Sequence, residues 1–291
     1  MGIRRPNSRK MVVPMSNGPV SKDHRALVTV VIPTRLKNLD YLLAALRSLE
    51  SQTFRDFEIL IFVDGGGPNE LSKLEAIADR RSTRIVWSQK NRGLARALNI
   101  SFRVARTPFL ARMDDDDLCL PNRLEVQMEL MLTGKYDVLG SAARIMDESG
   151  EISGDIAEGF DFNNKIPLRT LFFGSVFLHP TVVMSREWAV RNRYNPNWGR
   201  GQDRELWVRS LATARATNVS EPLLVYRIPS KPKDLLVLNS LSTLKLLSQS
   251  GRRFGLRVYL LMPVAAVRFV YACVLAGYGR VSRYAKTSVG A

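Results

Sequence analysis

The chain has 291 residues, of which 45% are hydrophobic and 24% charged, so it can bury a substantial core and is neither a disordered nor a repeat protein. Its only cysteines, Cys119 and Cys273, lie far apart without metal-ligand spacing, which excludes a disulfide framework and favours a reducing, cytoplasmic setting. A formal net charge of +16 points to an anionic partner.

The positive charge is concentrated at the two ends of the chain. Residues 1–25 carry six Lys or Arg and one Asp, and residues 235–291 carry eight Lys or Arg and no acid, so the body between them is close to neutral. Basic ends of this kind suit lipid headgroups or nucleic acid and do not by themselves choose between them. The first end has no apolar segment of signal-peptide length, so we do not expect secretion.

Strands and helices alternate over the first part of the chain. Strands are predicted at 27–32, 57–63 and 84–87, and helices at 39–52, at about 70–81 and from about 93. The second strand ends at Asp64, before three glycines that allow backbone to approach a ligand closely. This alternation predicts a parallel sheet with right-handed crossovers.

The later part of the chain is less regular. We expect a helix at 120–132 with Pro121 in its first turn, a strand at 136–146, a loop at 154–165, strand-like runs within 171–184, a helix at 203–214, a strand at 223–228 and a linker at 229–234.

Four consecutive carboxylates, residues 114–117, directly follow the apolar run at 109–111. Like charges in a row repel one another and cannot sit in a core, so a divalent metal at the end of a buried strand would explain them. Asp114 and Asp116 can project on the same side of an extended segment, with Asp115 pointing away and Asp117 holding the loop. A solvated acidic turn is the alternative.

The C-terminal segment differs in kind from the rest. Between Arg257 and Arg280 its only charge is Arg268, and it is long enough to span a bilayer. An arginine near the midpoint and Pro263 disfavour a simple span, and at 100° per residue the cations at 253, 257, 268, 283 and 286 share one side. We therefore expect helices that lie in the interface of an anionic membrane, with a buried docking helix and a single span as alternatives.

Six motifs occur in the order and spacing of family 2 glycosyltransferases, and the chain resembles the bacterial exopolysaccharide and O-antigen branch. They are VVIPTR at 30–35, the strand end at 64–65, NRGLARALN at 91–99, MDDDD at 113–117, HPT at 179–181 and GQDRELW at 201–207. The stretch LPNRLE at 120–125 adds to the likeness, which covers about residues 27–228. The resemblance implies a Rossmann-like nucleotide-diphospho-sugar transferase fold, named GT-A, and an inverting transfer from a nucleotide sugar.

The resemblance also assigns roles on the donor side. It implies that Asp64 contacts the uracil of a UDP-sugar, Asp114 the ribose, and Asp116 a Mn²⁺ or Mg²⁺ ion that assists departure of the nucleoside diphosphate. Further donor-binding candidates are Pro33, Thr34, Asn91, Gly93, Arg96 and His179. Individually, Asp64 is also a common turn former, Asn91 and Asn99 also suit an ordinary helix cap, and His179 also suits a structural role.

Inverting transfer needs a base that takes the proton of the acceptor hydroxyl. Asp203 matches the aspartate that serves this role in the family, although Gln202 stands where a glutamate is usual. A helix N-terminal carboxylate favoured by the dipole is the alternative for Asp203. Trp198 and Trp207 could offer sugar-stacking faces or belong to the core.

These patterns divide the chain into a basic tail (1–25), a GT-A domain (26–228) and a linker with an apolar, basic helical segment (229–291). We expect a metal-dependent enzyme, peripheral on the cytoplasmic membrane face, that moves a sugar to a lipid-linked or polysaccharide acceptor and has no nucleic-acid partner. The alternative is a non-catalytic α/β domain whose basic ends bind nucleic acid or anionic lipid.

Overall fold

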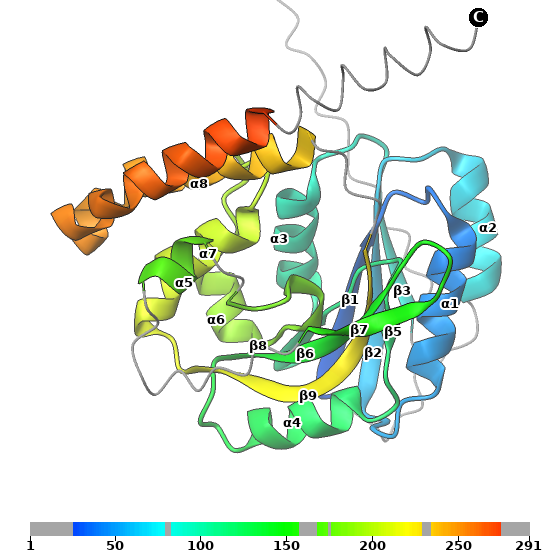
Figure 1. Cartoon of the computed structure of the whole chain (residues 1–291). Coiled ribbons are helices and arrows are strands. Elements are labelled where there is room, and N and C mark those ends of the chain that lie inside the picture. The colour runs from blue at the N-terminus through cyan, green and yellow to red at the C-terminus, as the bar shows by residue number, and fades with distance from the viewer. Residues whose placement is uncertain (1–25, 79–82, 157–167, 174–175, 229–233, 275–291) are drawn as a thin grey trace, which may run out of the picture.

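The computed structural model describes residues 26–78, 83–156, 168–173, 176–228 and 234–274 (Figure 1). The predicted tail at 1–25, most of the linker at 229–234 and the last cationic residues at 280, 283 and 286 lie outside the described residues.

One half of the central sheet is parallel, as predicted. Its strands are β1 (Val28–Thr34), β2 (Phe57–Asp64), β3 (Thr83–Ser88) and β4 (Phe109–Arg112), in the order β3-β2-β1-β4. Both β2 and β4 pair in parallel with β1, and β3 pairs in parallel with β2. The carboxyl ends of these strands therefore meet at one edge of the sheet, where ligands bind in folds of this kind.

The other half of the sheet, built by the later and less regular part of the chain, is mixed. It contains β5 (Leu118–Cys119), β6 (Val138–Met146), β7 (Ile152–Ile156), β8 (Val183–Ser185) and β9 (Ala216–Arg227). Strand β8 runs antiparallel between β4 and β6, β9 is parallel to β6, and β5 and β7 form antiparallel pairs. The regular β–α alternation ends after β4, and the connections that follow no longer impose parallel crossovers.

Helices cover both faces of the sheet (Figure 1). On one face lie α1 (Leu39–Glu50), α2 (Pro68–Ala78) and α4 (Arg123–Leu132), and on the other lie α3 (Leu94–Val104), α5 (Leu168–Phe173), α6 (Arg186–Arg191) and α7 (Gln202–Ser210). Strand β1 serves both layers, because Val28, Val30 and Ile32 face α1 while Val31 faces α3. All its residues are buried, which explains the continuous apolar run.

Several boundaries differ from the sequence expectations. The strand-like runs expected within 171–184 are in part helical, because α5 ends at Phe173 and a 3-10 turn η1 covers His179–Thr181, while β8 begins at Val183. Helix α4 starts at Arg123, after Pro121, because the short strand β5 occupies the preceding segment. Strand β7 covers the start of the predicted loop, and β9 begins seven residues early through a polar stretch interrupted by Pro222, where its register with β6 shifts.

The C-terminal segment forms a pair of helices above α5 and α7 (Figure 1). Helix α8 (Asp234–Phe254) is followed by a turn at Gly255, which has a φ of +67°, by a 3-10 segment η3 (Leu256–Leu261) and by helical residues 262–274. The turn separates Arg253 from Arg257, so the expected single stripe of cations along one helix is not formed. Arg268 instead stands over the ring of Phe173, 5.4 Å from its centroid.

A fully buried arginine ties the two halves of the sheet together. Arg123 donates to the backbone oxygens of Arg112 at 2.7 Å and Pro180 at 2.9 Å, and also to Gln127 and to the Cys119 sulfur. One guanidinium thus joins the end of β4, helix α4 and the turn η1. Such a buried charge is stabilised only by this complete set of acceptors.

We expect Arg123→Met to lower the free energy of unfolding by about 2–4 kcal/mol, because each buried carbonyl left without a donor costs about 1–3 kcal/mol. Urea denaturation would measure the difference. Arg47→Met, on the exposed side of α1, is the matched control and should change stability by less than about 0.5 kcal/mol. Equal effects of the two substitutions would contradict this account of Arg123.

Candidate active site

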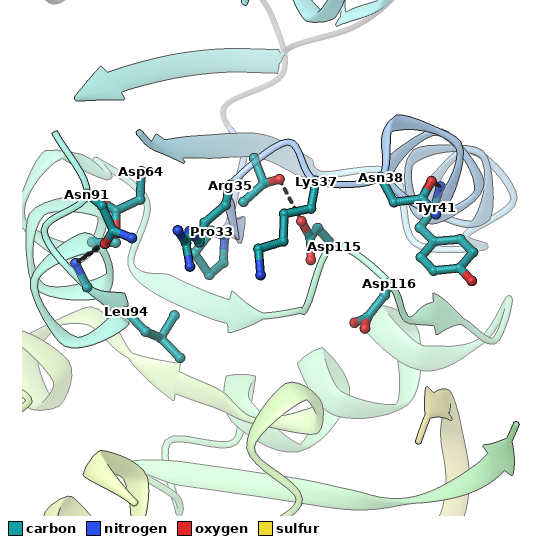
Figure 2. A pocket seen from close by; sticks show the side chains of 13 residues that line it. Pro33, Arg35, Lys37, Asn38, Tyr41, Asp64, Asn91, Leu94, Asp115 and Asp116 are labelled. Carbon is teal, nitrogen blue, oxygen red and sulfur yellow. Dashed lines mark hydrogen bonds between the residues drawn. The ribbon is translucent and has the colours of Figure 1, made fainter. Parts of the chain in front are cut away.

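A cleft of about 510 Å³ opens at the carboxyl ends of β1 and β2, beside the acidic loop (Figure 2). Of the residues singled out in the sequence, the cleft is lined by Pro33, Thr34, Asp64, Asn91, Gly93, Asp115 and Asp116. Arg96, Asp114, His179 and Asp203 are not among its lining residues. Sequence analysis missed Arg35, Lys37 and Tyr41, which also line it, although basic residues directly after a strand end are a recognisable signal.

Asp64 positions the loop that closes one side of the cleft. Its carboxylate, 4% exposed, accepts the backbone N–H groups of Arg92 at 2.6 Å and Gly93 at 2.8 Å. Gly93 has a φ of +84°, which other residues rarely adopt, and its N–H is also accepted by the Asn91 side chain. Arg96 lies further along α3, exposed, and donates to the Arg92 carbonyl. Asp64 therefore binds backbone here and holds the entrance of α3 in place.

The four carboxylates of the acidic loop have different partners. Asp115 accepts the hydroxyl of Thr34 at 2.6 Å, which fastens the loop to the end of β1. Asp114 pairs with Arg112, and Asp117 accepts the backbone N–H of Arg227 at 3.0 Å. Asp115 lines the cleft beside Asp116 and is not part of the group formed by the carboxylates of Asp114, Asp116 and Asp117.

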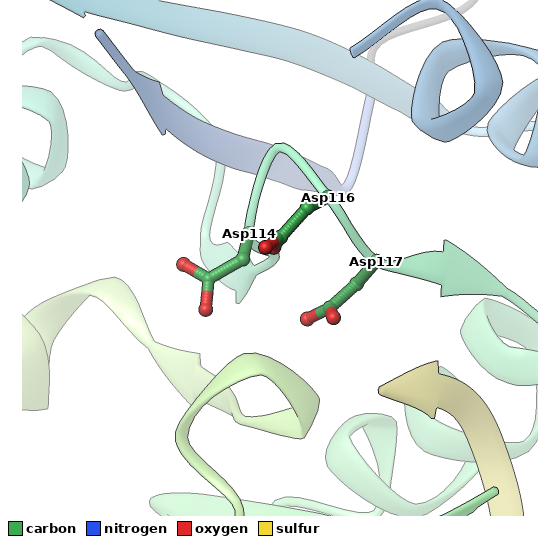
Figure 3. A group of neighbouring side chains, drawn as sticks. All are labelled: Asp114, Asp116 and Asp117. Carbon is green, nitrogen blue, oxygen red and sulfur yellow. The ribbon is translucent and has the colours of Figure 1, made fainter. Parts of the chain in front are cut away.

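Asp114, Asp116 and Asp117 bring three carboxylate oxygens within 4.8 Å of one another (Figure 3). Burial and the charges of Asp114 and Asp115 raise the pKa of Asp116 to about 6. Burial, and next the charge of Asp114, raise the pKa of Asp117 well above its ordinary value. One oxygen of Asp117 is buried without a hydrogen-bond partner. An orphaned buried oxygen among crowded carboxylates fits a hard divalent cation such as Mg²⁺ or Mn²⁺, which takes oxygen ligands.

Arg112, which sequence analysis did not identify as a site residue, supplies positive charge within this loop. It is 3% exposed and forms the ion pair with Asp114. Burial lowers the pKa of Arg112, but the charges of Asp114 and Asp117 outweigh it and leave that pKa raised. A single guanidinium faces several carboxylates, so the loop retains an excess of negative charge beside the cleft.

Behind the acidic loop, Tyr194 and His179 form a buried pair. The Tyr194 hydroxyl lies 2.7 Å from His179 Nε2, and the Tyr194 backbone is held by Asn99 at 2.8 and 2.9 Å. Burial and then the charge of Arg112 lower the pKa of His179 well below its ordinary value, so this imidazole is neutral. His179 packs among Tyr194 and Trp207 and does not reach the cleft.

Asp203 lies in the first turn of α7 and is partly exposed. Burial raises the pKa of Tyr194, and the charges of Asp203 and Asp114 add to this effect. Both carboxylates therefore lie within electrostatic range of one buried phenol. The cleft beside Asp116 does not extend to Asp203.

The two tryptophans belong to the packed interior. Trp207 is 2% exposed and packs on Phe177 and Trp188. Trp198 is 4% exposed, lies under the Lys245 amine and donates to Ser242 of α8. Neither presents a free face for stacking on a sugar.

Comparison with known proteins agrees with this geometry. Residues 29–192 match the family model described as Glycosyl transferase family 2. The chain is 31% identical to the O-antigen biosynthesis glycosyltransferase WbnJ of Escherichia coli over 195 residues, which covers 66% of this chain and 76% of that one. It is 30% identical to the amylovoran biosynthesis glycosyltransferase AmsE of Erwinia amylovora, covering 78% and 90%.

A third relative, 25% identical over 67% of this chain and 72% of its own, is the E. coli UDP-Glc:alpha-D-GlcNAc-diphosphoundecaprenol beta-1,3-glucosyltransferase WfgD. Among solved structures, the fold resembles the mannosyltransferase PcManGT of Pyrobaculum calidifontis in complex with GDP-Man and Mn²⁺ (TM-score 0.62, 15% identity, 92% of this chain and 81% of that one). It also resembles S. aureus TarS 1-349 in complex with UDP (TM-score 0.56, 17% identity, 76% and 65%).

The fold and the site therefore define a GT-A glycosyltransferase. The chain belongs to glycosyl transferase family 2, in its O-antigen and exopolysaccharide type, for which an inverting mechanism is typical. The fold and family expected from the sequence are confirmed.

We expect millimolar Mn²⁺ to raise the melting temperature of the protein. A site filled at a hundredfold excess over its Kd contributes about 2.7 kcal/mol, a shift of roughly 5 °C. Differential scanning calorimetry with and without EDTA would measure it. Asp116→Ala should abolish the shift and Asp155→Ala, on the exposed strand β7, should keep it. An unchanged shift in Asp116→Ala would remove that carboxylate from the cation site.

Proposed function

We propose that this enzyme transfers a sugar with inversion from a UDP-sugar to a lipid-linked or polysaccharide acceptor in surface glycan synthesis, with Mn²⁺ or Mg²⁺ at the acidic loop. The observation that carries the proposal is the position of the loop. Crowded carboxylates lie at the rim of a cleft that also contains Arg35 and Lys37. A cleft with both charges is suited to a diphosphate and its cation.

On the donor side, Arg35 and Lys37 lie between Asp64 and Asp116 in the cleft (Figure 2). Their positive charges would bind the diphosphate, while the wall formed by Pro33, Thr34, Asn91 and Gly93 would bind the nucleoside. The TarS structure is a complex with UDP, and WfgD is named for UDP-Glc as its donor, which supports a uridine donor. His179, buried behind the acidic loop, would support the donor site without contacting the donor. Arg96 would contribute to donor binding from the exposed side of α3.

A divalent ion held by Asp116, with Asp114 near the ribose, would supply Lewis-acid stabilisation of the departing nucleoside diphosphate. The protein's own contribution is the spacing of these carboxylates. Asp115 and Asp116 both line the cleft, where Asp115 accepts the Thr34 hydroxyl, while the Arg227 backbone holds Asp117.

Asp203 would act as the base. The acceptor hydroxyl oxygen attacks the anomeric carbon while its proton passes to the Asp203 carboxylate. The bond between that carbon and the diphosphate oxygen breaks, and its electron pair leaves with the nucleoside diphosphate. Attack from the face opposite the leaving group inverts the configuration at the anomeric carbon.

The C-terminal helices support the proposed cellular location. The segment Leu256–Val274 is long and apolar enough to cross a membrane, and only 17% of its most apolar window is buried. Its exposed side carries Leu256, Tyr259, Leu260, Val264, Val267, Val270, Tyr271 and Val274. One edge of the segment is docked on the domain through the buried residues Val258, Ala265 and Ala272. The segment therefore has features of both the expected interfacial helix and the alternative of a buried docking helix. We propose peripheral attachment to the cytoplasmic face of the plasma membrane.

Asp203→Asn should lower kcat for sugar transfer by about 10²-fold or more, because a general base contributes about 10²–10⁴-fold. Nucleotide release from a panel of UDP-, GDP- and dTDP-sugars with Mn²⁺ would identify the donor and measure the rate. Glu187→Gln, on the exposed side of α6, is the control with an unaltered rate. If Asp203→Asn lost only thermal stability and turned over at the normal rate, Asp203 would be a helix-terminal carboxylate and not the base.

Replacing Leu256, Leu260 and Val267 together by Ser should weaken partition onto phosphatidylglycerol vesicles by about tenfold or more, since each side chain buries apolar area in the interface. Vesicle sedimentation would measure it. Leu132→Ser and Ile152→Ser alter apolar residues elsewhere on the protein, 55% and 50% exposed, and should leave partition unchanged. Equal loss in both sets would show that attachment does not depend on this helix.

A further inference from the structure

A second, smaller cavity lies between α7, α8 and the helical residues 262–274. Its volume is about 120 Å³, well below that of the cleft described above, so it suits a compact ionic group and not a nucleoside or a sugar ring. Its polar and aromatic lining residues are Phe173, Arg204, Asn239, Ser240, Thr243 and Arg268.

Two arginines converge on this cavity without an acidic partner. Arg204 donates to the Thr243 hydroxyl at 2.7 Å, and Arg268 stands over the Phe173 ring. Neither takes part in an ion pair with any carboxylate of the residues that the structure describes. Burial lowers the pKa of Arg204; the charge of Asp203 opposes this effect, and that of Arg268 adds to it. Like charges that face one cavity among neutral side chains are favoured when an anion lies between them.

The chemistry of the lining fits a phosphate group. Guanidinium groups bind phosphate oxygens through paired N–H donors, and the neutral amide and hydroxyl groups of Asn239 and Ser240 add polar contacts at the same wall. Arg268 is also the only charged residue between Arg257 and Arg280. In a helix whose exposed side is apolar, this arginine is placed over Phe173, toward the domain.

The cavity lies between the proposed base, Asp203, and the apolar C-terminal helix. Arg204 follows Asp203 in the first turn of α7, and Arg268 belongs to the helix with the exposed apolar side. In a lipid-linked sugar the diphosphate joins the sugar that carries the accepting hydroxyl to the lipid chain. Along the protein, the arginine cavity lies between the proposed base and the apolar helix. Along a lipid-linked acceptor, the diphosphate lies between the accepting hydroxyl and the lipid, so the two orders match.

We propose that the cavity bounded by Arg204 and Arg268 binds the diphosphate of a lipid-linked acceptor and so places the acceptor hydroxyl at Asp203. This inference rests on the proposed function, since it names the acceptor class for the same active site. It assigns Arg204 and Arg268 to acceptor binding, separate from the donor cleft that contains Arg35 and Lys37.

Direct binding of inorganic pyrophosphate to the full chain tests the cavity without turnover. Pyrophosphate would be titrated calorimetrically in EDTA. Arg204→Gln and Arg268→Gln should each weaken pyrophosphate binding at one class of site by about tenfold or more, because each substitution removes a charged donor. Arg257→Gln, exposed on η3, is the matched control and should bind normally. Arg204→Lys keeps the charge and should retain part of the affinity, which separates a binding loss from a folding defect.

If only Arg35→Gln and Lys37→Gln weakened pyrophosphate binding, the donor cleft would be the sole diphosphate site and the proposal would be overturned. Phosphatidylglycerol vesicles distinguish an acceptor site from a headgroup site. Loss of vesicle partition in Arg204→Gln and Arg268→Gln, with pyrophosphate binding intact, would assign the cavity to bilayer lipid and also overturn the proposal.

With a diphospholipid-linked sugar as acceptor, Arg268→Gln should raise the KM for the acceptor by about tenfold or more, and by more than it lowers kcat. An unchanged KM would contradict the assignment. Failure of the unaltered enzyme to transfer sugar to any lipid-linked acceptor would instead refute the proposed function, whereas the pyrophosphate titration would still report on the cavity.

Discussion

The repulsion among the carboxylates at the end of β4 is the constraint on which the site depends. Four acids follow one another, and three of them have different polar partners: Arg112 for Asp114, Thr34 for Asp115 and the Arg227 backbone for Asp117. Asp116 is left at the cleft. Negative charge therefore remains in excess where a cation and a diphosphate would meet, and the fold around the loop must be rigid enough to hold that arrangement.

That rigidity comes from the junction between the parallel and mixed halves of the sheet. Arg123, with every hydrogen-bonding contact buried, joins β4 to the turn η1, while Asn99 fixes the backbone of Tyr194 against α3. Tyr194 in turn binds His179 and lies within range of both Asp114 and Asp203. These contacts form one buried polar network behind the acidic loop, in which a change at one member affects the others.

The C-terminal helices pack on the domain with one edge and expose apolar residues on the opposite side. Their docked edge is small and buried, through Val258, Ala265 and Ala272, while the opposite side exposes large apolar residues. A soluble monomer rarely exposes a continuous apolar strip of this kind. The same helices contribute Arg268 to the cavity beside α7, so one segment both covers the domain and presents an apolar surface outward.

The sequence by itself determined the parallel half of the fold, the family and the location of the acidic motif, because these depend on local periodicity and on residue types at fixed spacing. It also indicated that Asp114 and Asp116 lie together, whereas Asp117, which strict alternation would place with Asp115, joins them because residues 115–116 form a turn. Only the tertiary structure decided that β8 runs antiparallel in the sheet, that Asp64 binds backbone N–H groups and that His179 is a buried neutral partner of Tyr194. These depend on contacts between segments far apart in the chain, and local sequence patterns carry no information about such contacts.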